Sequence, residues 1–134
     1  MRRHDPARRA VSALALVLIA LGGCHRPVAV SGRLLYNGEP LKGRGPDDIT
    51  MTFCRMVDGK DQWAELKRVD VNQEQGTFQL PVGLVPGTYR IAVHQRDPQT
   101  GKDRFQDAFR QGASPLIREV TGTDELVLDL ARPE

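Results

Sequence analysis

The chain reads VAVSGRLLYNG over residues 28–38, and apolar side chains occupy alternate positions of this stretch as far as Tyr36. A period of two places these side chains on one face of a β-strand. Asn37 and Gly38 follow, and both tolerate a positive φ, which makes this dipeptide the strongest short-range signal for a hairpin turn. The stretch therefore predicts a strand, a tight turn and the edge of a second strand.

The rest of the chain continues this pattern of short strands separated by turns. The clearest strand is Tyr89–His94, where Tyr, Ile and Val alternate with Arg, Ala and His. Further strands are expected over residues 49–54, 63–71, 77–80, 116–120 and 126–130. One helical turn is expected over residues 105–111, where Phe105 and Phe109 would pack together onto the sheet. Short strands recurring about every ten residues favour an all-β, antiparallel sandwich.

An export signal precedes this β domain. Residues 1–9 carry four arginines, residues 11–21 are apolar except for Ser12, and the run closes on Leu21-Gly22-Gly23-Cys24. This layout is typical of a bacterial lipoprotein signal peptide. The apolar run is shorter than the roughly 20 residues of a membrane-spanning helix.

The signal divides the chain into three parts. We expect cleavage between Gly23 and Cys24, which removes residues 1–23, and lipidation of Cys24. Residues 24–28 would then form the lipidated tether, and residues 29–134 would form one domain. A chain of this length buries roughly two-thirds of its unfolded surface, which suffices for a single core.

The charge balance argues against nucleic acid as a partner. The whole chain has 19 basic and 17 acidic residues, and the loss of residues 1–23 takes away four arginines and one aspartate. The mature part is left with 15 basic and 16 acidic residues. A nearly neutral surface without a block of Lys or Arg offers no means of neutralising a phosphate backbone.

Three motifs carry a resemblance to a known family. The opening Val30–Leu41, the later Gly76-Thr77-Phe78 and the segment Pro86–Val93 resemble, in order and spacing, the carboxypeptidase-regulatory-like, transthyretin-like domains of bacterial lipoproteins. The resemblance covers nearly the whole mature chain. It implies a Greek-key sandwich of about seven strands with an accessory rather than a catalytic role. The chain departs from the family at Asn72–Gly76, where an Asp-x-x-Gly turn is common.

The cysteines and histidines give no sign of a disulfide or of a catalytic site in the sequence. Lipidation of Cys24 would leave Cys54 without a disulfide partner, and we expect Cys54 to be a small buried strand residue. A Cys54–His94 nucleophile pair is the enzymatic alternative, but no catalytic motif surrounds either residue. His94 belongs to the outward set of its strand and is expected to be solvated.

The carboxylates are expected to act as solvated turn formers. They lie in loops beside basic residues, at Asp47, Asp48, Asp58, Asp61, Asp97 and Asp103. No pair of His or Cys has the spacing of metal ligands, so no metal site, cofactor or catalytic residue is predicted. Tyr89 follows Pro86-Gly87 and is expected to hydrogen-bond a nearby backbone group, as in a tyrosine corner.

Trp63 is the one tryptophan of the chain. A buried position in the core is the interpretation that we favour. An exposed Trp63 would instead be the best candidate for a binding residue, because aromatic rings stack on sugars and anchor protein contacts.

These observations predict a lipid-anchored, non-enzymatic β module of the cell envelope, with a structural or protein-interaction role. Its partners would be membrane lipid through the acylated Cys24 and an envelope protein or glycan. His25 is not the aspartate associated with retention at the inner membrane, which favours the outer membrane, facing the periplasm. The alternative function is a carbohydrate- or peptide-binding module that uses an exposed face near Trp63.

Overall fold

The computed structural model describes residues 26–122 and 125–134, and the regular secondary structure of this part of the chain is almost entirely β-strand. A single 3₁₀ turn, η1, covers Trp63–Glu65. The strands are β1 Ser31–Tyr36, β2 Glu39–Pro40, β3 Ile49–Val57, β4 Lys60–Asp61, β5 Lys67–Val71, β6 Thr77–Gln79, β7 Gly87–Gln95, β8 Ile117–Val120 and β9 Glu125–Asp129. The prediction of an all-β domain is confirmed.

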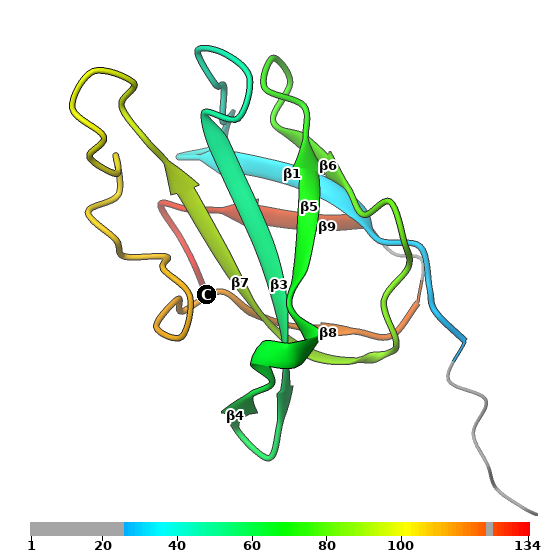
Figure 1. The fold of residues 1–134 in the computed structure, drawn as a ribbon. Coiled ribbons are helices and arrows are strands. Elements are labelled where there is room, and N and C mark those ends of the chain that lie inside the picture. Colours follow the sequence, from blue (N-terminus) through cyan, green and yellow to red (C-terminus); the bar gives the residue numbers. More distant parts are fainter. Residues whose placement is uncertain (1–25, 123–124) are drawn as a thin grey trace, which may run out of the picture.

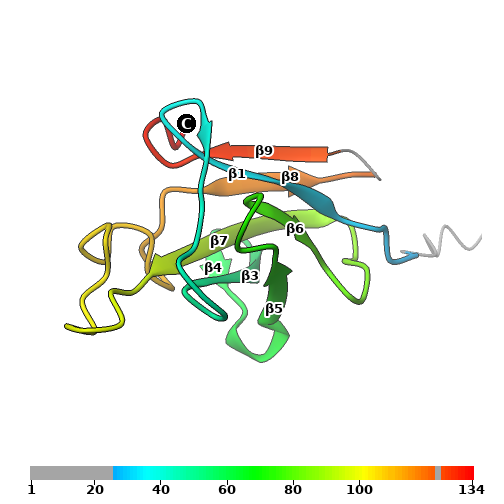
Figure 2. The ribbon, with the colours of Figure 1, turned by 90° about the horizontal axis from the view of Figure 1, so that it is seen from above.

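The strands form one sheet that curls into a half-barrel (Figures 1 and 2). The ladder runs in the order β2-β1-β6-β5-β3-β7-β8, with β4 added to β3 and β9 added to β1. Strand β5 makes the bend, because Lys67–Val69 pair with β3 and Asp70–Val71 pair with β6. The two halves of the sheet therefore face each other across a common interior.

One strand pair departs from the expected antiparallel arrangement. Strand β9 runs parallel to β1, with Ser31 opposite Glu125 and Leu35 opposite Asp129. The chain leaves β8 near the end where β1 begins, as the shared contacts of Val30, Gly122 and Leu126 around one small cavity indicate. Strand β9 therefore starts at the same end of the sheet as β1 and runs in the same direction.

The core lies between the two halves of the sheet and follows the alternation of the strands. Leu34, Phe53, Ile91 and Leu128 are fully buried. The Phe53 ring lies 6.2 Å from the Phe78 ring and 6.1 Å from the Tyr89 ring, centroid to centroid. These aromatic contacts join β3 to β6 and β7 through the centre of the molecule.

The Asn37-Gly38 turn is confirmed and is fastened to β9. Asn37 and Gly38 have φ of 54° and 82°. Their N–H groups donate to the two carboxylate oxygens of Asp129 at 2.9 Å and 2.8 Å. Burial raises the pKa of Asp129, but the hydrogen bonds from Ala131, Gly38 and Asn37 outweigh it and leave this pKa below its ordinary value.

Two local predictions need correction. The strand expected over residues 63–71 is η1 followed by the shorter β5, because the chain turns at Trp63 before it rejoins the sheet. The helical turn expected over residues 105–111 is a series of turns in which Gln106 and Asp107 have φ of 54° and 60°. Phe105 and Phe109 nevertheless pack together, with ring centroids 5.5 Å apart.

Gly32 provides a test of the packing between β1 and its neighbours. A Cβ at this position would overlap the carbonyl oxygen of Leu126 and would lie 2.5 Å from the Phe78 ring. We expect Gly32→Ala to lower the free energy of unfolding by about 2–3 kcal/mol or more in urea titrations. Gly45→Ala is the matched control, since nothing lies within 4 Å of its added Cβ. Equal stability of the two variants would contradict this account of β1.

Candidate functional site at the end of β7

The outer face of strands β3 and β7 is covered by the segment that follows β7. Cys54 lies opposite Arg90 and Thr50 opposite His94 on this face. The Phe109 carbonyl accepts a hydrogen bond from the Val93 N–H at 3.0 Å, and the Leu116 carbonyl accepts one from Ile91 at 2.8 Å. The segment therefore follows the free edge of β7 and brings its polar residues over the outer face.

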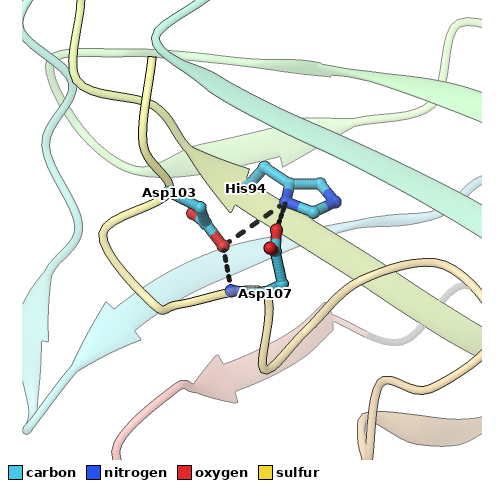
Figure 3. A group of neighbouring side chains, drawn as sticks. All are labelled: His94, Asp103 and Asp107. Atoms are coloured by element: carbon cyan, nitrogen blue, oxygen red, sulfur yellow. Dashed lines mark hydrogen bonds and ion pairs between the residues drawn. The ribbon is translucent and has the colours of Figure 1, made fainter. Parts of the chain in front are cut away.

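His94, Asp103 and Asp107 meet where β7 ends (Figure 3). The Nδ1 atom of His94 lies 3.4 Å from Oδ2 of Asp103 and 3.8 Å from Oδ1 of Asp107. The Asp103 side chain is only 3% exposed, whereas that of Asp107 is 62% exposed. Nδ1 itself is buried and has no hydrogen-bond partner. This arrangement combines one imidazole and two carboxylates at the distances of an ion-binding group.

Backbone groups hold Asp103 in place. The N–H of Gln95 donates to its Oδ1 at 3.0 Å, and the N–H of Asp107 donates to its Oδ2 at 2.9 Å. Arg104 fastens the same loop to two strands. Its guanidinium lies over the Tyr36 ring of β1 at 4.9 Å and donates to Gln95 Oε1, at the end of β7, at 3.1 Å. The carboxylate is therefore oriented before any ligand arrives.

Two predictions for these residues are wrong. His94 does lie on the outward face of its strand, but its side chain is only 18% exposed because the loop covers it. Asp103 does hold a turn, through the N–H of Asp107, but its carboxylate is buried and not solvated. The sequence signal was a strand-ending histidine followed by aspartates 9 and 13 residues later. Only the path of the loop brings the three together.

A charged cleft lies beside this cluster. It has a volume of about 300 Å³, and Asp103 borders both the cleft and the cluster. Arg44, Arg96 and Lys102 line it and have no ion-pair partner within 4 Å among residues 26–122 and 125–134. The acidic residues on its wall are engaged in turns, as predicted for Asp97. Hydrogen bonds from the N–H groups of Gln99 and Thr100 hold the pKa of Asp97 below its ordinary value.

Cys54 is buried, as expected, at 4% exposure. Next to it, Arg90 pairs with Asp61 at 3.1 Å and donates to the Ser114 carbonyl at 2.7 Å. Burial raises the pKa of the Cys54 thiol, and the Asp61 charge raises this pKa further. Cys54 and His94 are four residues apart along the paired strands, or about 13 Å. The structure does not form the Cys54–His94 pair.

The favoured interpretation of Trp63 as a core residue is wrong. Trp63 is 54% exposed and lies outside the core. One side of the indole covers Gly112, where an added Cβ would come within 3.2 Å of the ring. Tyr89, in contrast, behaves as predicted, because it is buried and its hydroxyl donates to the Val85 carbonyl at 2.6 Å.

The two signal-cleavage residues, Gly23 and Cys24, lie outside the described residues, and so does His25. Residues 26–122 and 125–134 contain no helix with the length and apolar character that a bilayer crossing requires.

The fold has partial counterparts among solved structures. A DUF3823 family protein from Parabacteroides merdae ATCC 43184 is similar over 77% of this chain and 45% of its own, with a TM-score of 0.46 and 21% identity. Another, from Bacteroides uniformis ATCC 8492, is similar over 78% of this chain and 43% of its own, with a TM-score of 0.49 and 16% identity. The chain thus spans less than half of either structure. No protein-family model and no curated protein sequence matches it.

The burial of Cys54 predicts a slow thiol. In the folded protein we expect Cys54 to react with a thiol reagent far more slowly than in urea, since the side chain is covered and the raised pKa leaves less thiolate at a given pH. The rate should increase with pH through a midpoint above the ordinary value of 9.0. Rates measured with the Cys24→Ala variant isolate this thiol. Equal rates for folded and unfolded protein would refute the burial.

Proposed function

We propose that the protein is a lipid-anchored, non-enzymatic β module of the cell envelope that binds a protein partner at the end carrying the charged cleft. The observation that supports this proposal is that the cleft and the point where the described chain enters the fold lie at opposite ends of the domain. The described chain enters the fold at one end, and the segment 97–112 lies at the other, in both views (Figures 1 and 2). A lipid at Cys24 would leave the cleft facing away from the membrane.

The short connection to Cys24 supports a fixed orientation. Val28 pairs with Leu84 through hydrogen bonds of 2.8 Å and 2.9 Å. Only three residues lie between Cys24 and Val28, so the four Cα–Cα steps of this link span at most about 14 Å. Val82 lies on the neighbouring loop and is 70% exposed. In this orientation Val82 would lie close to the lipid surface, where an apolar side chain is favoured.

The cleft end has the properties of a polar contact surface. Arg44, Arg96 and Lys102 are exposed there and are available to a negatively charged surface. Because exposed charges steer association and add to specificity, this end suits an acidic patch on an envelope protein. The separation of Cys54 from His94 supports a non-enzymatic role for the described residues.

The finer fold and location belong to the same proposal. We assign the curled sheet to the transthyretin-like, Greek-key sandwiches, supported by the order of the sequence motifs and by the Tyr89 hydrogen bond to Val85. His25 after the lipidated cysteine supports the outer membrane, facing the periplasm.

The anchor can be tested by mass and by thiol count. We expect the full chain, purified in detergent from a bacterium that processes lipoproteins, to lack residues 1–23 and to carry diacylglycerol and acyl mass on Cys24. The unfolded protein should then titrate as one thiol, from Cys54, and the Cys54→Ala variant as none. Two thiols, or a chain in the aqueous phase with its initial methionine, would overturn the anchor.

The orientation can be tested on the same membranes. A photo-cross-linking residue at Val82 should capture lipid, and one at Thr100, on the cleft wall, should capture protein. Charge reversal of Arg44 together with Arg96 should reduce the capture at position 100 and leave the capture at position 82 unchanged. Capture of lipid at position 100 would contradict the orientation.

A second candidate function rests on the exposure of Trp63. A half-exposed indole held against Gly112 offers a flat, rigid face for a sugar ring or a peptide side chain. If this function holds, iodide will quench the Trp63 fluorescence, a glycan or peptide array will show a specific ligand, and Trp63→Ala will weaken its binding about tenfold or more. Val127→Ala, an exposed apolar residue on β9, should leave binding unchanged. Equal ligand binding by the two variants would exclude Trp63 as a binding residue.

A further inference from the structure

Three donor atoms converge where β7 meets the loop that follows it. We propose that His94, Asp103 and Asp107 bind a divalent transition-metal ion such as Zn²⁺, through Nδ1 of the histidine and one oxygen of each aspartate.

The separations fit a coordination shell better than hydrogen bonds. Nδ1 of His94 lies 3.4 Å from the Asp103 oxygen and 3.8 Å from the Asp107 oxygen, and all three atoms lie within 4.8 Å of one another. A hydrogen bond from a ring N–H is typically about 2.7–3.2 Å long. Zn–N and Zn–O bonds of about 2.0–2.2 Å place neighbouring tetrahedral ligands roughly 3.4 Å apart. Small side-chain movements would complete the shell.

The histidine atom in this group lacks a partner. Nδ1 has less than 1 Å² of accessible surface and takes part in no hydrogen bond. A buried nitrogen without a partner costs about 1–3 kcal/mol. Figure 3 shows that it points toward the two carboxylates. A metal ion at the centre would use the lone pair of a neutral imidazole, which is the form of histidine that binds metals.

The charges also suit a divalent ion. Asp103 and Asp107 bring two negative charges, and no Lys or Arg pairs with either within the described part of the chain. One divalent cation with two carboxylates and a neutral imidazole is electrically balanced. The N–H groups of Gln95 and Asp107 orient the Asp103 carboxylate, in the manner of the outer groups that support metal ligands.

The donor set indicates the class of metal. Imidazole suits Zn²⁺, Cu²⁺ and Ni²⁺, whereas Ca²⁺ and Mg²⁺ prefer oxygen ligands alone. Asp107 lies on the exposed side, so a remaining coordination position would be open to water. The ion would link the loop to β7 beside the charged cleft.

Titration calorimetry of the untagged full chain in detergent tests the proposal, with Zn²⁺ and Ca²⁺ as the probes. We expect saturable binding of one Zn²⁺ that millimolar Ca²⁺ does not displace. Asp107→Asn should weaken this binding by at least about tenfold, and His94→Gln should abolish it. With Co²⁺ as the probe, the wild type should develop a visible absorption band that Asp107→Asn reduces.

Asp58→Asn is the matched control, because Asp58 is also exposed and has a left-handed φ of 51°, against 60° at Asp107. It should bind Zn²⁺ as the wild type does. Asp107 is exposed, so its variant remains informative even if His94→Gln fails to fold. Equal Zn²⁺ affinity in wild type and Asp107→Asn, the absence of saturable binding, or preferential binding of Ca²⁺ would each overturn the proposal.

Discussion

The pairing of β5 with two strands from different halves of the sheet is the constraint on which the rest of the structure depends. Residues 67–69 continue the ladder of β3, and residues 70–71 continue that of β6. The sheet is therefore one hydrogen-bonded surface that bends, and Phe53 and Phe78 meet inside the bend. The same curvature turns the opposite face of β3 and β7 outward, where the loop after β7 can cover His94 and Cys54.

The outer face of β3 and β7 carries polar side chains, and ion pairs and hydrogen bonds hold the covering segment against it. Arg90 and Asp61 have side chains only 18% and 10% exposed, and Ser114 is completely buried beside them. Removing one partner of a buried ion pair leaves an uncompensated charge, which is strongly unfavourable. The hydrogen bonds from Gln95 to Asp103 and from Arg90 to the Ser114 carbonyl thus fix where the segment from residue 103 to residue 115 lies.

The sequence was sufficient to predict those features that depend on local periodicity. The alternation of Tyr89–His94 and the Asn37-Gly38 turn are properties of neighbouring residues. The structure confirms the strand and the turn. The burial of Cys54 was also predicted, although the residues that cover it were not. The parallel course of β9, the exposure of Trp63 and the meeting of His94 with Asp103 depend on contacts between distant segments. A single-sequence pattern carries no direct record of such contacts, because loop paths are set by packing.

Strands β8 and β9 each pair with only one other strand of the described sheet, and both are short. Strand β8 has four residues and β9 has five. Arg118, Glu119 and Glu125 bring charge to them, and Arg118 donates to the Pro133 carbonyl at 3.1 Å, which brings the C-terminal residues against β8. Short, charged edges discourage the addition of strands from other chains. Crowded copies of this domain on one surface would accordingly resist cross-β aggregation, and recognition would fall to the loops.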